Sequence, residues 1–223
     1  MQRSRGSGAR DQVLVVGLGR FGSALARELE VLGHEVLAVD ANESIVNELA
    51  PDVTHALQLD ATDEAALRAA GAGDFPTAMI AISSDTEASI FAAMALKRLG
   101  VKTVIAKAGS QLHGAILERV GVDRVVYPEA EMAVQVARTH GNPNVIEYLN
   151  VAPNVGLEKI SPPASFVGQT MADLDLPGRL GLTPIALRRG DRVTVNPGPS
   201  ERIGEGDELI LIGPDDRLER LRQ

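Results

Sequence analysis

The sequence predicts an α/β fold in which a doubly wound parallel sheet is followed by a small α+β lobe. Two observations lead to this prediction. From residue 11 to about residue 140, short apolar runs such as VLVV, AMIAI and TVIA alternate with segments of helical periodicity, as strands buried on both faces of a parallel sheet do. Beyond that point, short β-like runs separated by Pro and Gly replace the alternation. A chain of 223 residues is long enough for two such units.

The first unit is expected to hold six strands, each followed by a helix. The expected strands are 13–16, 36–39, 54–59, 78–82, 103–108 and 124–127, and the helices after the second to sixth strands are 42–50, 61–70, 85–99, 110–120 and 129–140. The second unit is expected to hold strands at 156–160, 184–188, 192–195 and 208–212, with helices at 169–174 and 215–221. We therefore predict a disordered leader at 1–10, a Rossmann-type lobe at 11–140, a linker at 141–149 and the small lobe at 150–223.

The first strand runs into the turn GLGRFG at residues 17–22, after which leucines recur at helical spacing. In such a turn, Gly17 permits the tight bend, Gly19 lets backbone N–H groups approach a pyrophosphate, and Gly22 allows close packing of the helix. The second strand ends at Asp40, about 20 residues further on, where a carboxylate accepts hydrogen bonds from a ribose diol. The pattern predicts a nucleotide site, and the alternative is a glycine turn with a purely structural role.

Charged side chains are expected beside the phosphates of this nucleotide. Arg20 and Phe21 lie inside the turn, where a guanidinium can fork a terminal phosphate; an arginine directed to solvent is the alternative. Lys107 closes the fifth strand and places a cation toward the same crevice. Glu129, just after the sixth strand, can bind Mg²⁺ or Ca²⁺ near the phosphates through its oxygens, and an ordinary first-turn glutamate is the alternative.

Two further strand ends are candidates for contact with the nucleotide. Asp60 and Ala61 follow the third strand, where a carboxylate or a backbone amide can meet the adenine ring; a helix N-cap at Asp60 is the alternative. Ser83 follows the fourth strand and is either a ligand contact or part of an N-cap cluster.

Composition argues against several classes of protein. With 22 Lys and Arg against 30 Asp and Glu, the net charge is −8 and no basic stripe is present, which disfavours a nucleic-acid partner. The lack of cysteine excludes disulfides and thiolate metal sites. No run approaches the roughly 18 apolar residues of a membrane span, and no signal-peptide pattern is seen, so we expect a cytoplasmic protein. We expect no enzyme, because the second unit has no histidine to serve a dehydrogenase as proton donor.

Several stretches together resemble one known family. They are GLGRFG at 17–22, LDATD at 59–63, GVDRVVYPEAEMA at 121–133 and ERIGEGDELILIG at 201–213. Across residues 11–221 the chain resembles the regulator-of-potassium-conductance (RCK) domain in its form with a TrkA-N lobe and a TrkA-C lobe, and in particular the stand-alone gating subunits of Ktr/Trk-type potassium uptake systems. The resemblance implies a cytosolic regulatory subunit, peripheral to the inner face of the membrane, that gates a separate integral-membrane potassium-translocating subunit.

The resemblance also implies ligands for both lobes. In the first lobe it implies ATP or ADP, with NAD or NADH as the alternative, and it assigns phosphate contacts to Arg20 and Lys107 and the divalent cation to Glu129. In the second lobe it implies cyclic di-AMP, near Arg179 and the turn formed by Asn196 and Pro197.

Self-assembly is expected as well. The resemblance implies dimers that assemble into an octameric ring. The apolar stripe of the helix 85–99, formed by Ile90, Met94 and residues 96–99, exceeds what one small sheet needs and is expected to pack between subunits.

Overall fold

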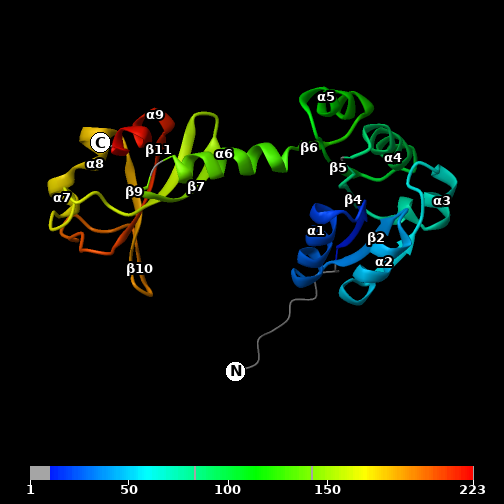
Figure 1. Ribbon diagram of the computed structural model, residues 1–223, viewed down its shortest axis with the longest axis horizontal. Helices are drawn as coiled ribbons and strands as arrows, with labels where there is room; N and C mark the ends of the chain where they lie inside the picture. The colour runs from blue at the N-terminus through cyan, green and yellow to red at the C-terminus, as the bar shows by residue number, and fades with distance from the viewer. Residues whose placement is uncertain (1–10, 83, 142, 223) are drawn as a thin grey trace. The chain divides into compact units, whose positions relative to one another are not determined.

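The computed structural model describes residues 11–82, 84–141 and 143–222, so the leader expected at 1–10 lies outside the described residues. The chain forms two compact units, Met1–Glu129 and Ala130–Gln223, which Figure 1 draws in blue to green and in green to red. Within the described residues, no helix is both long enough and apolar enough to cross a membrane.

The boundary between the units comes earlier in the chain than the sequence suggested. Helix α6 (Pro128–His140) belongs for most of its length to the second unit, although we assigned it to the first. Strand β7 (Val145–Ala152) occupies most of the segment expected to be a linker at 141–149. That segment is therefore part of the second unit's sheet.

The first unit contains a sheet of six strands in the order β3-β2-β1-β4-β5-β6. The strands are β1 (Gln12–Val16), β2 (Glu35–Asp40), β3 (His55–Gln58), β4 (Thr77–Ile80), β5 (Thr103–Lys107) and β6 (Arg124–Val126). All five pairings are parallel. The chain builds one side of the sheet outward from β1, then crosses over and builds the other side from β4. The predicted Rossmann-type doubly wound fold is confirmed.

Helices cover both faces of this sheet. They are α1 (Arg20–Val31), α2 (Glu43–Leu49), α3 (Glu64–Ala69), α4 (Thr86–Arg98) and α5 (Gln111–Val120), with single 3₁₀ turns at Ala50–Asp52 and Ala72–Asp74. Successive side chains of β1 point to opposite faces. Val13 therefore packs with Leu29 of α1 and Leu49 of α2, whereas Leu14 lies in the core that includes Leu67 of α3 and helices α4 and α5.

The apolar stripe of α4 serves this second core. Leu96 is fully buried, and Ile90 and Leu99 pack against the same cluster. The expectation that the whole stripe packs between subunits is therefore wrong for Leu96, whereas Ile90 and Leu99 are only partly buried. Residues of α3, α4 and α5 all contribute to this core.

Helix α3 begins three residues later than expected. Its N-cap is Asp63, whose Oδ1 accepts hydrogen bonds from the backbone N–H groups of Ala65 at 2.8 Å and Ala66 at 3.3 Å. Asp60, the alternative cap, does not cap this helix. The later start leaves residues 60–62 as a turn at the end of β3.

The second unit is a small α+β lobe, as predicted. Its sheet has the order β10-β9-β11-β8-β7, with all four pairings antiparallel. The strands besides β7 are β8 (Val155–Ile160), β9 (Thr183–Arg189), β10 (Arg192–Val195) and β11 (Glu208–Pro214). The helical elements besides α6 are α7 (Met171–Leu174), α8 (Leu176–Leu180), α9 (Asp215–Leu218) and a 3₁₀ turn at Glu219–Arg222.

Strand β7 and helix α8 were not expected from the sequence. Strand β7 is an edge strand with two register shifts against β8, so its buried residues, Val145 and Tyr148, do not follow a period of two. A two-residue turn with Asn154 in the left-handed region (φ 62°) closes the β7–β8 hairpin and was the available signal. Asp175, also left-handed (φ 41°), ends α7 and caps α8, so a second short helix follows directly after the one expected at 169–174.

Candidate nucleotide site

The predicted site residues of the first unit gather at one edge of its sheet. The glycine turn follows β1, Asp40 ends β2, Asp60 lies just beyond β3, Lys107 ends β5, and Glu129 comes shortly after β6. Because all six strands run parallel, these carboxyl ends share an edge, where ligands of doubly wound sheets bind. Ser83 follows β4 but lies outside the described residues.

The three glycines of the turn have different structural requirements. Gly17 has a φ of +89°, and a Cβ there would lie 2.7 Å from Cγ1 of Ile82. A Cβ on Gly22 would overlap the carbonyl oxygen of Gly17. In contrast, a Cβ on Gly19 would meet no atom of the described residues within 4 Å. The fold itself requires Gly17 and Gly22, so a purely structural role explains these two glycines. The free space at Gly19 is available to a ligand.

Helix α1 begins directly at this free space. Gly19 is its N-cap, no side chain caps it within the described part of the chain, and its first turn contains no acidic residue. The other helices that follow β2, β3, β4 and β5 are each capped by a side chain, from Asn42, Asp63, Asp85 and Ser110. The first N–H groups of α1 are therefore left for an anion.

Asp40 has a role in the loop that the sequence did not reveal. Its Oδ2 accepts a hydrogen bond from the backbone N–H of Leu18 at 2.6 Å, and its Oδ1 accepts one from Asn42 at 2.8 Å. The carboxylate thus ties the glycine turn to the end of β2. Each oxygen retains a second acceptor position, which is what a ribose diol requires.

Lys107 and Glu129 form an ion pair at the same edge. The side chain of Lys107 is 7% exposed, whereas that of Glu129 is 69% exposed. The ammonium of Lys107 also lies 5.4 Å from the centre of the Phe21 ring, within the range of a cation–π contact. The hydrogen bond from Lys107 is the main cause that holds the pKa of Glu129 below its usual value, and the charge of the exposed Arg20 contributes. The sequence placed these residues at one edge but did not reveal that they bind each other.

Asp60 and Ala61 offer less to a ligand than the sequence suggested. Asp60 accepts hydrogen bonds from the N–H of Thr62 at 2.9 Å and from its hydroxyl at 2.7 Å. These two bonds hold the pKa of Asp60 below its usual value. The side chain of Ala61 is buried in the core, so only its backbone remains for a ligand.

No ready-made metal site accompanies Glu129. In residues 11–82, 84–141 and 143–222, no group of three or more His, Asp or Glu side chains is arranged to hold a metal ion. A cation at Glu129 would therefore need further oxygen ligands from phosphates or water.

The three residues that were assigned to a second-messenger site lie on different parts of the second unit. Arg179 lies on α8 and lines a pocket, but the lining of that pocket does not include Asn196 or Pro197. Asn196 follows β10 with φ 52°, and its N–H donates to the carbonyl of Ile185 at 2.8 Å. Pro197 is buried.

The chain thus combines a doubly wound parallel sheet, which carries the candidate nucleotide site, with a small lobe built on an antiparallel sheet. The chain matches the TrkA-N domain over residues 13–128 and the TrkA-C domain over residues 157–223. It therefore belongs to the family of proteins with TrkA-N and TrkA-C domains, as the sequence resemblance implied.

Curated relatives match nearly the whole chain. Ktr system potassium uptake protein C of Bacillus subtilis (strain 168) is 37% identical over 204 residues, which cover 92% of each chain. Ktr system potassium uptake protein A of the same bacterium is 32% identical over 209 residues, or 94% of each chain. The chain is thus homologous to Ktr potassium uptake proteins.

Solved structures share the fold. The GsuK channel has a TM-score of 0.65 at 20% identity; the match covers 96% of this chain and 39% of that chain. The NAD(P)-binding domain of an exopolyphosphatase-related protein from Archaeoglobus fulgidus has a TM-score of 0.51 at 27% identity, and that match covers 59% of this chain and 97% of that one.

Proposed function

We propose that this chain is the cytosolic regulatory subunit of a potassium uptake system, which binds ATP or ADP in its first unit and gates a separate membrane pore. The homology to Ktr potassium uptake proteins supports the transport role. The observation that carries the nucleotide role is the free space at Gly19, at the uncapped start of α1. The ligand is sensed rather than transformed, so the chain acts without catalysis and self-assembles in a ring beneath the pore.

The Lys107–Glu129 ion pair gives this site a means of sensing phosphate. Lys107 is almost buried and keeps one strong partner, whereas Glu129 is largely in water. A nucleotide phosphate offers Lys107 a charge-assisted hydrogen bond worth about 1.5–3 kcal/mol. An ion pair with an exposed carboxylate contributes less free energy than this bond, so the phosphate displaces Glu129 from Lys107.

The displaced carboxylate becomes available to a divalent cation. Hard oxygen ligands suit Mg²⁺ and Ca²⁺, and the terminal phosphate of ATP supplies the oxygens that Glu129 lacks in its surroundings. Arg20, exposed at the start of α1, takes the same phosphate. ADP is one phosphate shorter and engages fewer of these groups. This differential affinity is what any ligand-driven switch needs.

Helix α6 carries the change onward. Glu129 lies in its first turn, and Arg138 in its last turn pairs with Asp215 of the second unit at 2.9 Å. Arg138 also lies 4.5 Å from the ring of Tyr148, whose hydroxyl donates to Asp215 at 3.0 Å. When Glu129 exchanges Lys107 for another partner, the first turn of α6 is therefore affected. The last turn of the same helix is held to the second unit by Arg138.

NAD or NADH is the second candidate ligand. The structural match to an NAD(P)-binding domain at 27% identity favours it. Asp40 at the end of β2 suits the free 2′-hydroxyl of NAD and repels the 2′-phosphate of NADP. Both candidates share the loop, Asp40 and the ribose contact, so they differ in the chemical group attached beyond the second phosphate.

Calorimetric titration of the purified chain with ATP, ADP, NADH and NADP, each with and without Mg²⁺, tests this proposal. We expect ATP and ADP to bind, ATP more tightly with Mg²⁺, and NADP to bind weakly. If NADH binds tightly and ATP does not bind, the site is as proposed but its ligand is NADH. If none of the four binds, the nucleotide proposal is wrong.

A further inference from the structure

The second unit contains a pocket of about 300 Å³, whose lining includes Arg179 but neither Asn196 nor Pro197. It lies between the segment before α7, helix α8 and the C-terminal 3₁₀ turn. Leu176 and Leu221, which line it, also belong to the buried core of this unit. Its floor is therefore rigid, because moving it would disturb core packing.

The wall of the pocket is held in place locally. The amide of Gln169 donates to the carbonyl of Ser165 at 2.6 Å, and both residues line the pocket. Phe166 and Leu180 also line the pocket. Both are partly buried and pack against the core of this unit. The cavity is thus apolar at its base and polar at its mouth, the usual arrangement of a small-molecule site.

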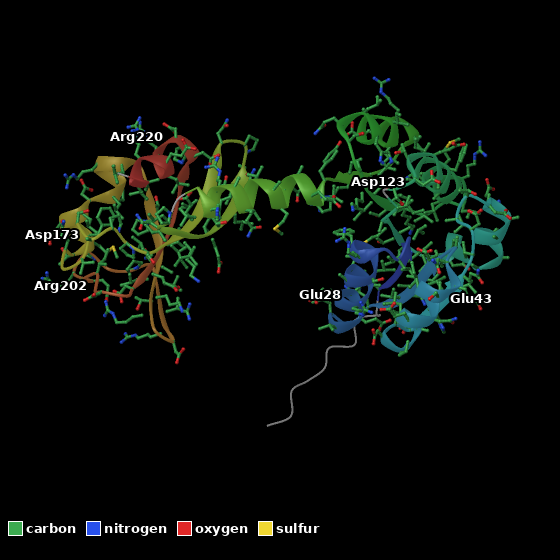
Figure 2. The ribbon with its side chains drawn as sticks, in the orientation of Figure 1. Glu28, Glu43, Asp123, Asp173, Arg202 and Arg220 are labelled. Atoms are coloured by element: carbon green, nitrogen blue, oxygen red, sulfur yellow. The ribbon has the colours of Figure 1, made fainter. Side chains whose placement is uncertain are left out.

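The charge of this pocket opposes that of the whole chain. Arg179 and Arg220 line it, and no lining residue is acidic, although the protein carries a net charge of −8. Arg220, labelled in Figure 2, lies 4.0 Å from Asp216, the limit of an ion pair, and its side chain is 57% exposed. In the described part of the chain, Arg179 makes no ion pair. Within the described residues, Arg179 therefore lacks a carboxylate partner, and the partner of Arg220 lies at the limit of an ion pair.

From this arrangement we infer that the pocket binds a small organic anion, with a carboxylate or phosphate group on an apolar or aromatic body. The planar guanidinium groups of Arg179 and Arg220 match the two oxygens of such an anion. Phe166 and the leucines of the floor accept its apolar body. The volume lies at the small end of the range for ligand pockets, about 300 to 1,000 Å³. A bound anion would link α8 to the C-terminal segment.

Fluorescence titration of the full-length chain with 1-anilinonaphthalene-8-sulfonate, an aromatic anion, tests the inference. We expect saturable binding that weakens by about tenfold or more in the double variant Arg179→Gln/Arg220→Gln, since two charge-assisted contacts are lost. Arg192→Gln removes the same charge from exposed β10, outside the pocket, and is expected to bind the dye like the parent. Displacement by phenyl phosphate or by phenylacetate then tells which anionic group is preferred.

The nucleotide site serves as the internal control. The double variant should bind ATP as the parent does, and saturating ATP should leave the bound dye in place. Equal dye affinity in the double variant and the Arg192→Gln control would overturn the inference. So would full displacement of the dye by ATP, or failure of both competitors to displace it. A chain that binds no nucleotide but shows the arginine-dependent dye site would refute the proposed function and leave this inference intact.

Discussion

Gly19 and Gly22 lie three residues apart, yet the fold requires only one of them. Gly19→Ala should leave the melting temperature within about 1 °C of the parent, because the added methyl group meets no atom in the part of the chain that the structure describes and the φ of −61° suits alanine. The same substitution should weaken nucleotide binding by roughly tenfold or more, because the methyl group occupies space that the phosphates need. Gly22→Ala should destabilise the chain by about 1–3 kcal/mol, through overlap with the carbonyl of Gly17.

Thermal melting and calorimetry of the two glycine variants provide the check. A loss of stability in Gly19→Ala equal to that in Gly22→Ala would mean that the space beside Gly19 is needed by the protein itself. Unchanged nucleotide affinity in Gly19→Ala would remove the main support for the site.

At the same edge, Arg20 and Glu129 are expected to separate ATP from ADP. Arg20→Gln should lower affinity for ATP about tenfold more than for ADP, because only ATP reaches past the second phosphate. Glu129→Gln should abolish the Mg²⁺ or Ca²⁺ dependence of ATP binding. It should also raise ADP affinity by up to about fivefold, since Lys107 loses the carboxylate that competes with phosphate.

The control for Glu129→Gln is Glu131→Gln, a loss of the same negative charge at an exposed position of α6. It should leave both affinities unchanged. If Glu129→Gln weakens ADP binding, Glu129 supports the ligand directly and the exchange of partners does not occur. If Arg20→Gln weakens both nucleotides equally, Arg20 is a general anion contact.

Among the elements of the second unit, β9 is tied to the start of its neighbour β11 by the buried carboxylate of Asp207, the residue before β11. Asp207, 2% exposed, receives hydrogen bonds from Arg189 at the end of β9, at 2.9 Å from Nε and 2.7 Å from Nη2, and one from the N–H of Gly204 at 2.7 Å. The Arg189 contacts are the main reason that the pKa of Asp207 lies below its usual value.

The stabilising effect of this carboxylate therefore depends on pH. Its folded-state pKa is lower than its unfolded value of about 3.9, so its contribution is complete above that value and is lost as pH falls through the folded pKa. Asp207→Asn should lower the melting temperature at pH 7 by roughly 3 °C or more, and the difference from the parent should shrink at pH 3. Melting followed by circular dichroism measures this. Asp191→Asn, at an exposed turn, should change little, and a pH-independent difference for Asp207→Asn would contradict the argument.

Helix α6 depends on Arg138 for its attachment to the second unit. Arg138→Met should speed amide hydrogen exchange in residues 134–140 by roughly tenfold, because the ion pair with Asp215 and the contact with Tyr148 are lost. The control is Arg217→Met, whose 3.6 Å ion pair with Asp216 lies at the surface. Unchanged exchange in Arg138→Met would mean that apolar contacts alone hold the helix.

For the whole molecule, exposed apolar side chains favour self-association. No side chain of α6 is buried, and Met132, Val134 and Val136 are each about half exposed, as are Leu149 and Val151 on β7. Such apolar surface is typical of protein interfaces. We expect light scattering to show an oligomer at about 10 μM protein, and Val134→Glu to reduce its size, since an interface disfavours a buried unpaired charge.

Gln111→Glu, which adds the same charge at an exposed position of α5, should leave the oligomer intact. A monomer at every concentration, with and without ATP, would refute self-assembly of this chain.

The first unit and the outline of its site could be predicted from the sequence. Glycine spacing, apolar strands and the acid at the end of β2 are local patterns, and parallel strand order places their carboxyl ends together. For this reason Gly17, Gly22 and Asp40 could be located before the structure was known. The second unit was harder to predict, because the bulged edge strand β7 and the left-handed break at Asp175 interrupt the periodicity on which such a prediction depends.

The partners of these residues could be identified only in the folded chain. Lys107 and Glu129 are 22 residues apart on separate elements, as are Leu18 and Asp40, and no spacing in the chain predicts that they bond to each other. The pocket between Arg179 and Arg220 arises in the same way, from the packing of α8 against the C-terminal segment. Secondary structure follows from neighbours along the chain, whereas the partner of a charged side chain depends on which elements pack beside it in space.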